Sequence, residues 1–128
     1  MNNYLSEKTH TSPEISLNAQ NGTIEISGRS IPENAMKIYR PVIDWIDEYL
    51  VNPKPKTEIV FRLSFFNTST SKYLMELLKR FEEIKRQGFD VQVCWFYDDE
   101  DIRDIAEDYQ ALVNVPMSFV KTNYVSNE

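Results

Sequence analysis

Strand-like and helix-like hydrophobic patterns alternate along most of this chain, and this alternation limits its possible folds more than any other feature. Residues 58–66 and 91–97 are short runs rich in β-branched and aromatic side chains, as is typical of buried strands. Residues 73–86 and 102–113 instead carry apolar side chains every three or four positions, as an amphipathic helix does. Because a strand–helix–strand unit makes its two strands parallel, with a right-handed crossover, the pattern predicts an α/β fold.

The N-terminal half predicts two further strands and one further helix. Residues 14–19 and 23–28 alternate apolar and polar side chains on either side of an Asn-Gly pair, the strongest short-range signal for a β-hairpin. Residues 30–50 begin with a helix-start signal and continue with helical apolar spacing. Pro41 lies inside this helix and is expected to kink or restart it. A short strand at 117–120 completes the predicted order ββαβαβαβ.

The predicted fold class is therefore α/β, with a single-layer mixed sheet of four to five strands covered by about three helices. The length of 128 residues suits one domain, which we expect to span residues 13–122. Residues 1–12 are polar and are expected to form a flexible segment, and residues 123–128 are expected to form a tail.

Composition and charge argue against several classes of function. The net charge of −6 and the pI near 4.8 disfavour binding to nucleic-acid backbones, which requires a basic surface. The single cysteine, Cys94, cannot form an intrachain disulfide, and the single histidine, His10, is far from it in sequence, which disfavours a Cys–His catalytic pair. No apolar run approaches the length of a membrane span and no signal-peptide pattern is present, so we expect a cytoplasmic protein. We also expect that it uses no cofactor.

A cluster of hydroxyl side chains occupies the expected junction between the strand at 58–66 and the following helix. It reads Asn67, Thr68, Ser69, Thr70, Ser71, Lys72. The first N–H groups of a helix lack internal partners and carry the positive end of the helix dipole. The cluster can therefore serve simply as a helix cap, or it can hold an anion or accept a phosphate. The local pattern alone does not select one hydroxyl over the others.

An acidic cluster, Asp98 to Asp101, follows the next buried strand. Asp98 and Asp99 could hold Mg²⁺ in a small phosphotransfer enzyme, because hard cations bind carboxylate oxygens. The chain has no phosphate-binding loop with paired glycines and no histidine near either cluster, which weakens this alternative. The same carboxylates also suit the first turn of a helix, and they could repel a phosphate placed on the hydroxyl cluster.

The segment Gly28 to Ala35 also has two interpretations. Ser30, Pro32 and Glu33 suit the start of the first helix. Alternatively, Arg29 and Asn34 help to build a surface that a kinase or a target protein contacts.

Five segments taken together resemble the SiaC family of bacterial regulatory phosphoproteins. They are Thr11 to Ile15, Gly28 to Ala35, the Tyr39-x-Pro41-x-x-x-Trp45-x-x-x-Tyr49 pattern, Phe66 to Lys72, and Trp95 to Asp101. The resemblance extends from about Thr11 to Phe119, nearly the whole predicted domain. Its most specific motif is Gly-Arg-Ser-Ile-Pro-Glu-Asn, which occurs in the same chain as the Asn-Thr-Ser cluster.

The resemblance implies a non-enzymatic switch protein with an architecture like that of anti-sigma-factor antagonists. The resemblance implies that such a protein is phosphorylated by a cognate serine/threonine kinase and dephosphorylated by a PP2C-type phosphatase. Its unphosphorylated form binds and activates a diguanylate cyclase, which raises cyclic-di-GMP and favours aggregation or biofilm. The family's phosphoacceptor corresponds to Thr68 in this sequence.

Our hypothesis from the sequence is that unmodified Thr68 leaves a neighbouring surface free for a target protein, and that phosphorylation blocks this surface by charge and bulk. The expected partner-binding residues are Asn67, Ser69, Thr70, Ser71, Lys72, Arg29 and Asn34. An anti-sigma-factor antagonist proper, whose target is an anti-sigma kinase, remains an alternative with the same switch.

Overall fold

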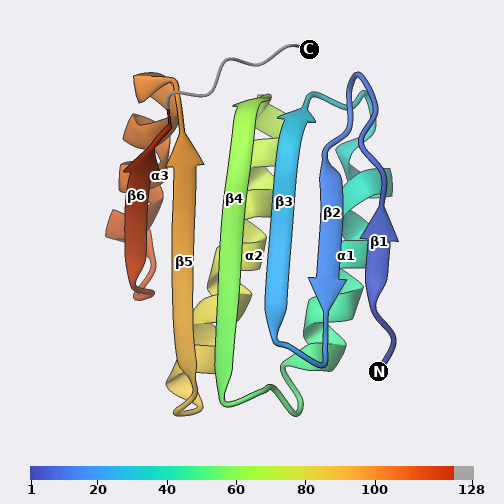
Figure 1. Cartoon of the computed structure of the whole chain (residues 1–128), viewed down its shortest axis with the longest axis vertical. Coiled ribbons are helices and arrows are strands. Elements are labelled where there is room, and N and C mark those ends of the chain that lie inside the picture. Colours follow the sequence, from blue (N-terminus) through green and yellow to red (C-terminus); the bar gives the residue numbers. More distant parts are fainter. Residues whose placement is uncertain (123–128) are drawn as a thin grey trace.

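The computed structural model describes residues 1–122, which form a six-stranded sheet and three helices (Figure 1). The strands are β1 (Tyr4–Ser6), β2 (Glu14–Asn18), β3 (Thr23–Ser30), β4 (Lys56–Phe66), β5 (Asp90–Tyr97) and β6 (Met117–Lys121). The helices are α1 (Ala35–Tyr49), α2 (Thr68–Arg86) and α3 (Glu100–Leu112). The predicted α/β class, with one mixed sheet and about three helices, is confirmed. None of these helices is long and apolar enough to cross a membrane.

The six strands lie in the sheet in their sequence order. Strands β1, β2 and β3 pair antiparallel, whereas β3 to β6 pair parallel through the helical crossovers. The β2–β3 hairpin is tight at Gly22, whose φ is 68°. A Cβ there would lie 2.6 Å from the carbonyl oxygen of Lys56, so both the backbone conformation and the close approach require glycine.

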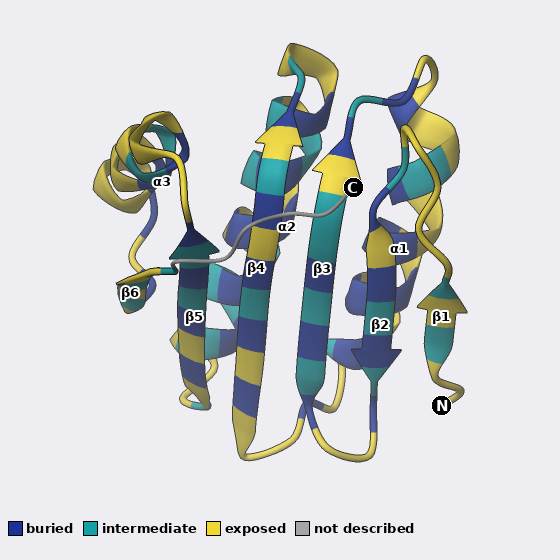
Figure 2. Cartoon of the chain, turned by 45° about the horizontal axis from the view of Figure 1, so that its top comes forward, coloured by how far each residue is buried: buried dark blue, intermediate teal, exposed yellow. Residues whose placement is uncertain are grey.

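All three helices cover the same face of the sheet, and the core lies between the helices and that face (Figures 1 and 2). The stripes of burial along β3 to β5 in Figure 2 reflect the alternation of side chains between the two faces. The rings of Phe61 on β4 and Trp95 on β5 stack in this core with centroids 4.4 Å apart. Trp95 also contacts Tyr109, which places α3 against the same face.

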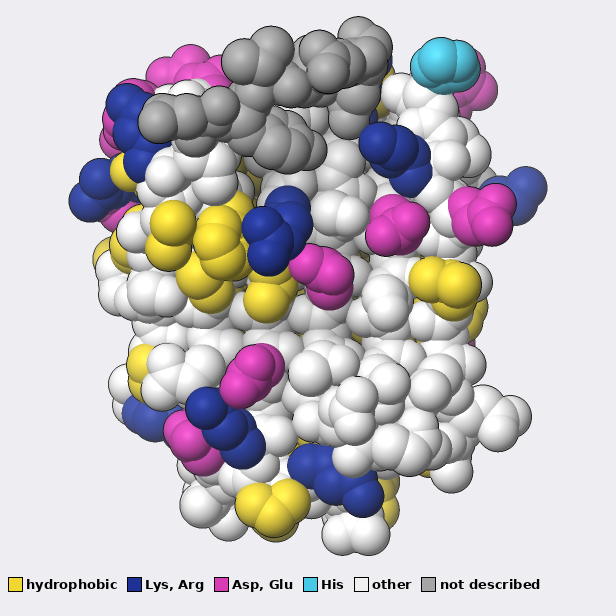
Figure 3. Space-filling model, viewed as in Figure 1, with side chains coloured by type: hydrophobic (Ala, Val, Ile, Leu, Met, Phe, Trp, Pro, Cys, Tyr) yellow, Lys and Arg dark blue, Asp and Glu magenta, His cyan; other side chains and the backbone are white. Residues whose placement is uncertain are grey.

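Within residues 1–122 no helix covers the opposite face of the sheet, and Figure 3 shows hydrophobic side chains gathered there between β4 and β6. Arg62 lies over the Phe96 ring, 3.9 Å from its centroid, and donates from Nε to Glu25 at 2.9 Å. The guanidinium of the arginine thus stacks on the aromatic ring while its Nε pairs with the Glu25 carboxylate at the water interface. This arrangement lets a one-sided α/β layer expose its second face to solvent.

The sheet has one strand more than the four to five predicted, because β1 lies in the segment 1–12 that we expected to be flexible. Tyr4 pairs with Leu17 of β2, and Asn3 Oδ1 accepts a hydrogen bond from the Ala19 amide at 3.0 Å. The indole of Trp45 donates to the carbonyl of Asn2 at 2.8 Å. A three-residue edge strand is too short to show a period in the sequence. The predicted tail at 123–128 lies outside the described residues.

Helix α1 also differs from its prediction. It begins at Ala35, after the motif that contains Ser30 and Pro32, and it continues through Pro41 without a restart. Pro41 is exposed, so the carbonyl of Lys37 that loses its helical donor can be hydrated instead.

We expect β1 to contribute measurably to stability. Replacing Tyr4, which packs against the core, with alanine should lower the free energy of unfolding by about 1–2 kcal/mol. Leu5, with 69% of its surface exposed, is the matched control, and Leu5→Ala should change the stability by less than about 0.5 kcal/mol. Denaturant unfolding would measure both values, and equal values would contradict a docked β1.

Candidate functional site

The predicted hydroxyl cluster lies at the junction of β4 and α2, as expected. Asn67 is the N-cap of α2, and its Oδ1 accepts hydrogen bonds from the Thr70 amide and from Ser69 Oγ, both at 3.0 Å. Thr68 is the first helical residue. The interpretation of this segment as a helix cap is confirmed, with the asparagine rather than a hydroxyl as the capping side chain.

The four hydroxyl residues of the cluster differ in their accessibility. Thr70 is fully buried, Ser71 is half-buried and hydrogen-bonded to the Tyr109 hydroxyl, and Ser69 is exposed but donates to Asn67. Thr68 is exposed, and its hydroxyl has no hydrogen-bond partner among residues 1–122. Of the four, Thr68 therefore offers the hydroxyl that an approaching protein can reach without breaking an existing bond.

A chain of buried hydroxyl groups lies beneath the first turn of α2. Thr70 Oγ1 donates to the Ser30 carbonyl at 3.1 Å, so it accepts at its 2.8 Å contact with Ser30 Oγ. Ser30 Oγ has then used its one hydrogen and accepts from the Tyr39 hydroxyl at 2.7 Å. All three residues are 0% exposed, and together they join the end of β3, α1 and the start of α2.

The predicted partner-binding residues differ in their accessibility. Thr70 is buried, so it supports the helix from inside and cannot contact a partner in this structure. Arg29 is exposed at the end of β3, where it lines a hollow with Lys8 and His10. Asn34 is the exposed N-cap of α1 and makes no side-chain cap hydrogen bond.

Thr68 and Lys72 contribute to a hollow of about 430 Å³ on the helical side of the molecule. The hollow is lined by Thr68, Ser71, Lys72, Met75, Glu76, Lys79 and Tyr109. Six of these side chains come from successive turns of α2, and the seventh comes from α3. Tyr109 could not be assigned to this site from the sequence, because its 3.6-residue spacing indicated only a core position on its own helix.

The acidic cluster is arranged as a helix start. Asp99 is the N-cap of α3, with its Oδ1 accepting from the Asp101 amide at 2.9 Å, and Glu100 pairs with Lys121 at 3.0 Å. The part of the chain that the structure describes contains no group of three or more His, Cys, Asp or Glu side chains able to hold a metal ion. This donor set does not favour the alternative of a Mg²⁺ enzyme that uses Asp98 and Asp99.

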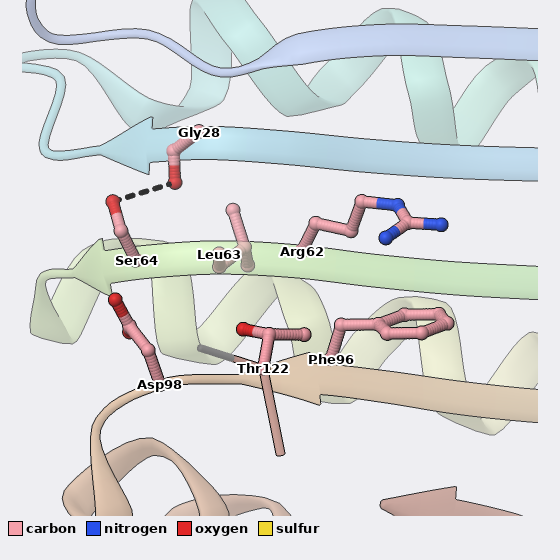
Figure 4. Close-up of a pocket in the computed structure, with 7 residues that line it drawn as sticks. All are labelled: Gly28, Arg62, Leu63, Ser64, Phe96, Asp98 and Thr122. Atoms are coloured by element: carbon pink, nitrogen blue, oxygen red, sulfur yellow. Dashed lines mark hydrogen bonds between the residues drawn. The ribbon is translucent and has the colours of Figure 1, made fainter. Parts of the chain in front are cut away.

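Asp98 lies in a different place from the hydroxyl cluster. Figure 4 shows its carboxylate directed toward Ser64, whose hydroxyl donates to the Gly28 carbonyl at 3.3 Å. These residues line a small pocket together with Arg62 and Phe96, which lie on the face without helices. Because Asp98 and Thr68 line separate hollows, the geometry does not support charge repulsion between the acidic cluster and a phosphate on Thr68.

The fold and this site define a small α/β domain that presents an exposed hydroxyl at a capped helix start, an arrangement compatible with a regulatory phosphoprotein. The sequence model for the SiaC family regulatory phosphoprotein matches residues 6–122. The chain is also 31% identical, over 112 residues, to an uncharacterized protein of Pseudomonas aeruginosa (strain UCBPP-PA14), an alignment that covers 86% of this chain and 89% of that protein. The chain therefore belongs to the SiaC family.

Solved structures of SiaC from Pseudomonas aeruginosa have the same fold. The crystal structure of apo-SiaC is 29% identical in sequence and superposes with a TM-score of 0.88, covering 94% of this chain and 99% of that one. A chain in the crystal structure of the diguanylate cyclase SiaD in complex with its activator SiaC gives the same identity and TM-score, covering 93% and 99%. These comparisons confirm the predicted family.

We expect the buried hydroxyl of Thr70 to stabilise the site. Thr70→Val keeps the shape but leaves the Ser30 carbonyl without this donor and Ser30 Oγ without this acceptor, so it should cost about 1–3 kcal/mol of stability. Thr70→Ser keeps the hydroxyl and should cost less. Denaturant unfolding distinguishes the two variants, and a valine variant as stable as the wild type would show that these bonds contribute nothing.

Tyr39 should make stability depend on pH in the alkaline range. Burial raises the pKa of Tyr39 from 10.0 to about 12, so the folded protein holds the phenol proton more tightly than the unfolded chain does. The contribution of the protonated phenol to the free energy of unfolding, roughly 2–3 kcal/mol, is complete below pH 10 and is lost as the pH rises through about 12. Unfolding measured at pH 9 and pH 11.5 should therefore show a smaller decrease for Tyr39→Phe than for the wild type. Equal decreases would contradict the assignment.

Proposed function

We propose that this chain is a non-enzymatic switch in the cytoplasm, controlled by phosphorylation of Thr68. A serine/threonine kinase transfers the γ-phosphoryl group of ATP to the Thr68 oxygen, which loses its proton as the bond to ADP breaks. A PP2C-type phosphatase hydrolyses the ester and releases inorganic phosphate. The unphosphorylated form binds and activates a target protein, a diguanylate cyclase, and so raises cyclic-di-GMP and favours biofilm formation.

The observation that carries this proposal is the free, exposed hydroxyl of Thr68 on an otherwise constrained helical turn. Its neighbours Ser69, Thr70 and Ser71 are each engaged in hydrogen bonds. A phosphate on the first helical residue also lies at the positive end of the α2 dipole, which stabilises negative charge. Both features support Thr68 as the acceptor.

The target surface that we propose contains Asn67, Ser69, Ser71 and Lys72, which are accessible or half-buried around Thr68. A phosphate would add nearly two negative charges and considerable bulk to this surface. Binding of a target is then weakened without any change of fold, because desolvated like charges and steric overlap oppose docking. Arg29 and Asn34 remain candidate contacts with the kinase or the target outside the hollow of Thr68.

A diguanylate cyclase is favoured over an anti-sigma kinase as the target by the likeness to SiaC, which in the solved complex is the activator of SiaD. An anti-sigma-factor antagonist proper would use the same acceptor and the same occlusion. The two outputs differ in the partner, so the partner must be identified directly.

The test is affinity purification of tagged Thr68→Ala and Thr68→Asp forms from the native host, with partners identified by mass spectrometry. A diguanylate cyclase should be enriched with the alanine form and reduced about tenfold or more with the aspartate form. Ser118→Ala, which removes an exposed hydroxyl of β6 outside the proposed target surface, is the matched control for binding and should keep the partner. The kinase should phosphorylate wild type and Ser69→Ala but leave Thr68→Ala unmodified.

Identical partner lists for the alanine and aspartate forms would contradict occlusion at Thr68. An anti-sigma kinase in place of the cyclase would support the alternative output with the same switch. Phosphate found on Ser69 in the wild-type protein would move the acceptor by one residue.

A further inference from the structure

Lys72 lies one helical turn after Thr68 on the same side of α2. Side chains four residues apart on a helix are neighbours, and each points back toward the N-terminus, so the ammonium of Lys72 can reach over residue 68. Both residues line the hollow described above. This spacing is the one at which oppositely charged helical side chains stabilise each other.

The charge of Lys72 is not engaged in the described part of the chain. Lys72 is exposed, and residues 1–122 give it no ion pair or hydrogen bond. The carboxylate one turn further along, Glu76, pairs with Arg80 at 3.5 Å. Arg80 also pairs with Asp47 of α1 at 2.7 Å, so this neighbouring network is complete without the lysine.

A second donor is available at the same end of the hollow. Ser71 and Tyr109 are hydrogen-bonded to each other through their hydroxyl groups, and this bond uses only one of their two hydrogens. Burial raises the pKa of Tyr109, so its hydroxyl remains protonated at neutral pH. Within residues 1–122 the second hydrogen of the pair has no acceptor, so it can be donated to an additional group.

We propose that the ammonium of Lys72 forms an ion pair with the phosphate on Thr68, and that the Ser71–Tyr109 pair donates a hydrogen bond to the same phosphate. This inference rests on the proposed function, because it requires Thr68 to be the acceptor. In the unphosphorylated protein the lysine is available to an acidic group of the target. In the phosphorylated protein it pairs within the chain, so phosphorylation removes a cation from the target surface as well as adding negative charge to it.

A second lysine that lines the hollow, Lys79, provides a control for the effect of Lys72 on the phosphate. The other charged side chains at the hollow are Glu76 on α2 and, on α3, Asp108, which adjoins Tyr109. Lys79 lies eleven residues after Thr68, about 16 Å along the helix axis, whereas Lys72 lies about 6 Å away. If Lys72 pairs specifically with the phosphate, replacing Lys72 should change the phosphate pKa strongly and replacing Lys79 should change it little, although each replacement removes one positive charge.

The experiment is a ³¹P NMR pH titration of the full-length chain with phosphothreonine incorporated genetically at position 68. The variants are the wild type, Lys72→Met, Lys72→Arg and Lys79→Met. Free phosphothreonine loses its second proton near pH 6, and pairing with a cation lowers that pKa. Lys72→Met should raise the phosphate pKa by about 0.3 or more relative to wild type, Lys72→Arg should restore it, and Lys79→Met should shift it by less than half as much.

Equal phosphate pKa values in the wild type and Lys72→Met would overturn the inference. Equal shifts in Lys72→Met and Lys79→Met would also overturn it, because they would indicate a general field rather than a pair. Binding of the cyclase to the same phosphorylated and unmodified proteins tests the proposed function separately. If the phosphorylated and unmodified forms bind the cyclase equally well, the proposed switch is contradicted, whatever the titration shows. If only the unmodified form binds, the proposed switch is supported, even where the titration contradicts the ion pair with Lys72.

Discussion

The site depends on the hydrogen bonds among Ser30, Tyr39 and Thr70, three fully buried residues that satisfy one another's hydroxyl groups. Each residue comes from a different element, so these hydrogen bonds hold the first turn of α2 against the end of β3 and against α1. Successive residues of a helix are rotated by about 100°, so Thr70 and Thr68 lie about 200° apart around α2. Because Thr70 points into the core, Thr68 must point outward.

In the function that we propose, this arrangement lets one hydroxyl of the four serve as the acceptor while the turn that carries it stays anchored. The Asn67 cap and the inward hydroxyl of Thr70 are two independent anchors for the same turn. A turn held in this way does not need to unfold when its exposed residue is modified. The switch that we propose therefore acts through surface charge and shape. A conformational switch would instead need a second stable arrangement of the turn.

The sequence predicted the parts of the structure that depend on local periodicity. The βαβ units, the hairpin at Gly22 and the position of the hydroxyl cluster follow from patterns within about twenty residues, and each is present. The three-residue strand β1 was missed because its pairing depends on side chains such as Trp45 that are distant in sequence. The burial of Thr70 was missed for the same reason, since its partner Ser30 is forty residues away.

The net charge of the chain and the local charge of the site act on different length scales. The protein carries −6 overall, which would oppose a further anion if the whole charge acted at the site. At physiological salt, however, exposed charges more than about 8 Å apart are largely screened. A phosphate on Thr68 would therefore respond mainly to the charges nearest to it, which are the start of α2 and the lysine one turn away. An acidic domain can thus accept a phosphate at a locally favourable position and keep the overall negative charge that discourages binding to nucleic acid.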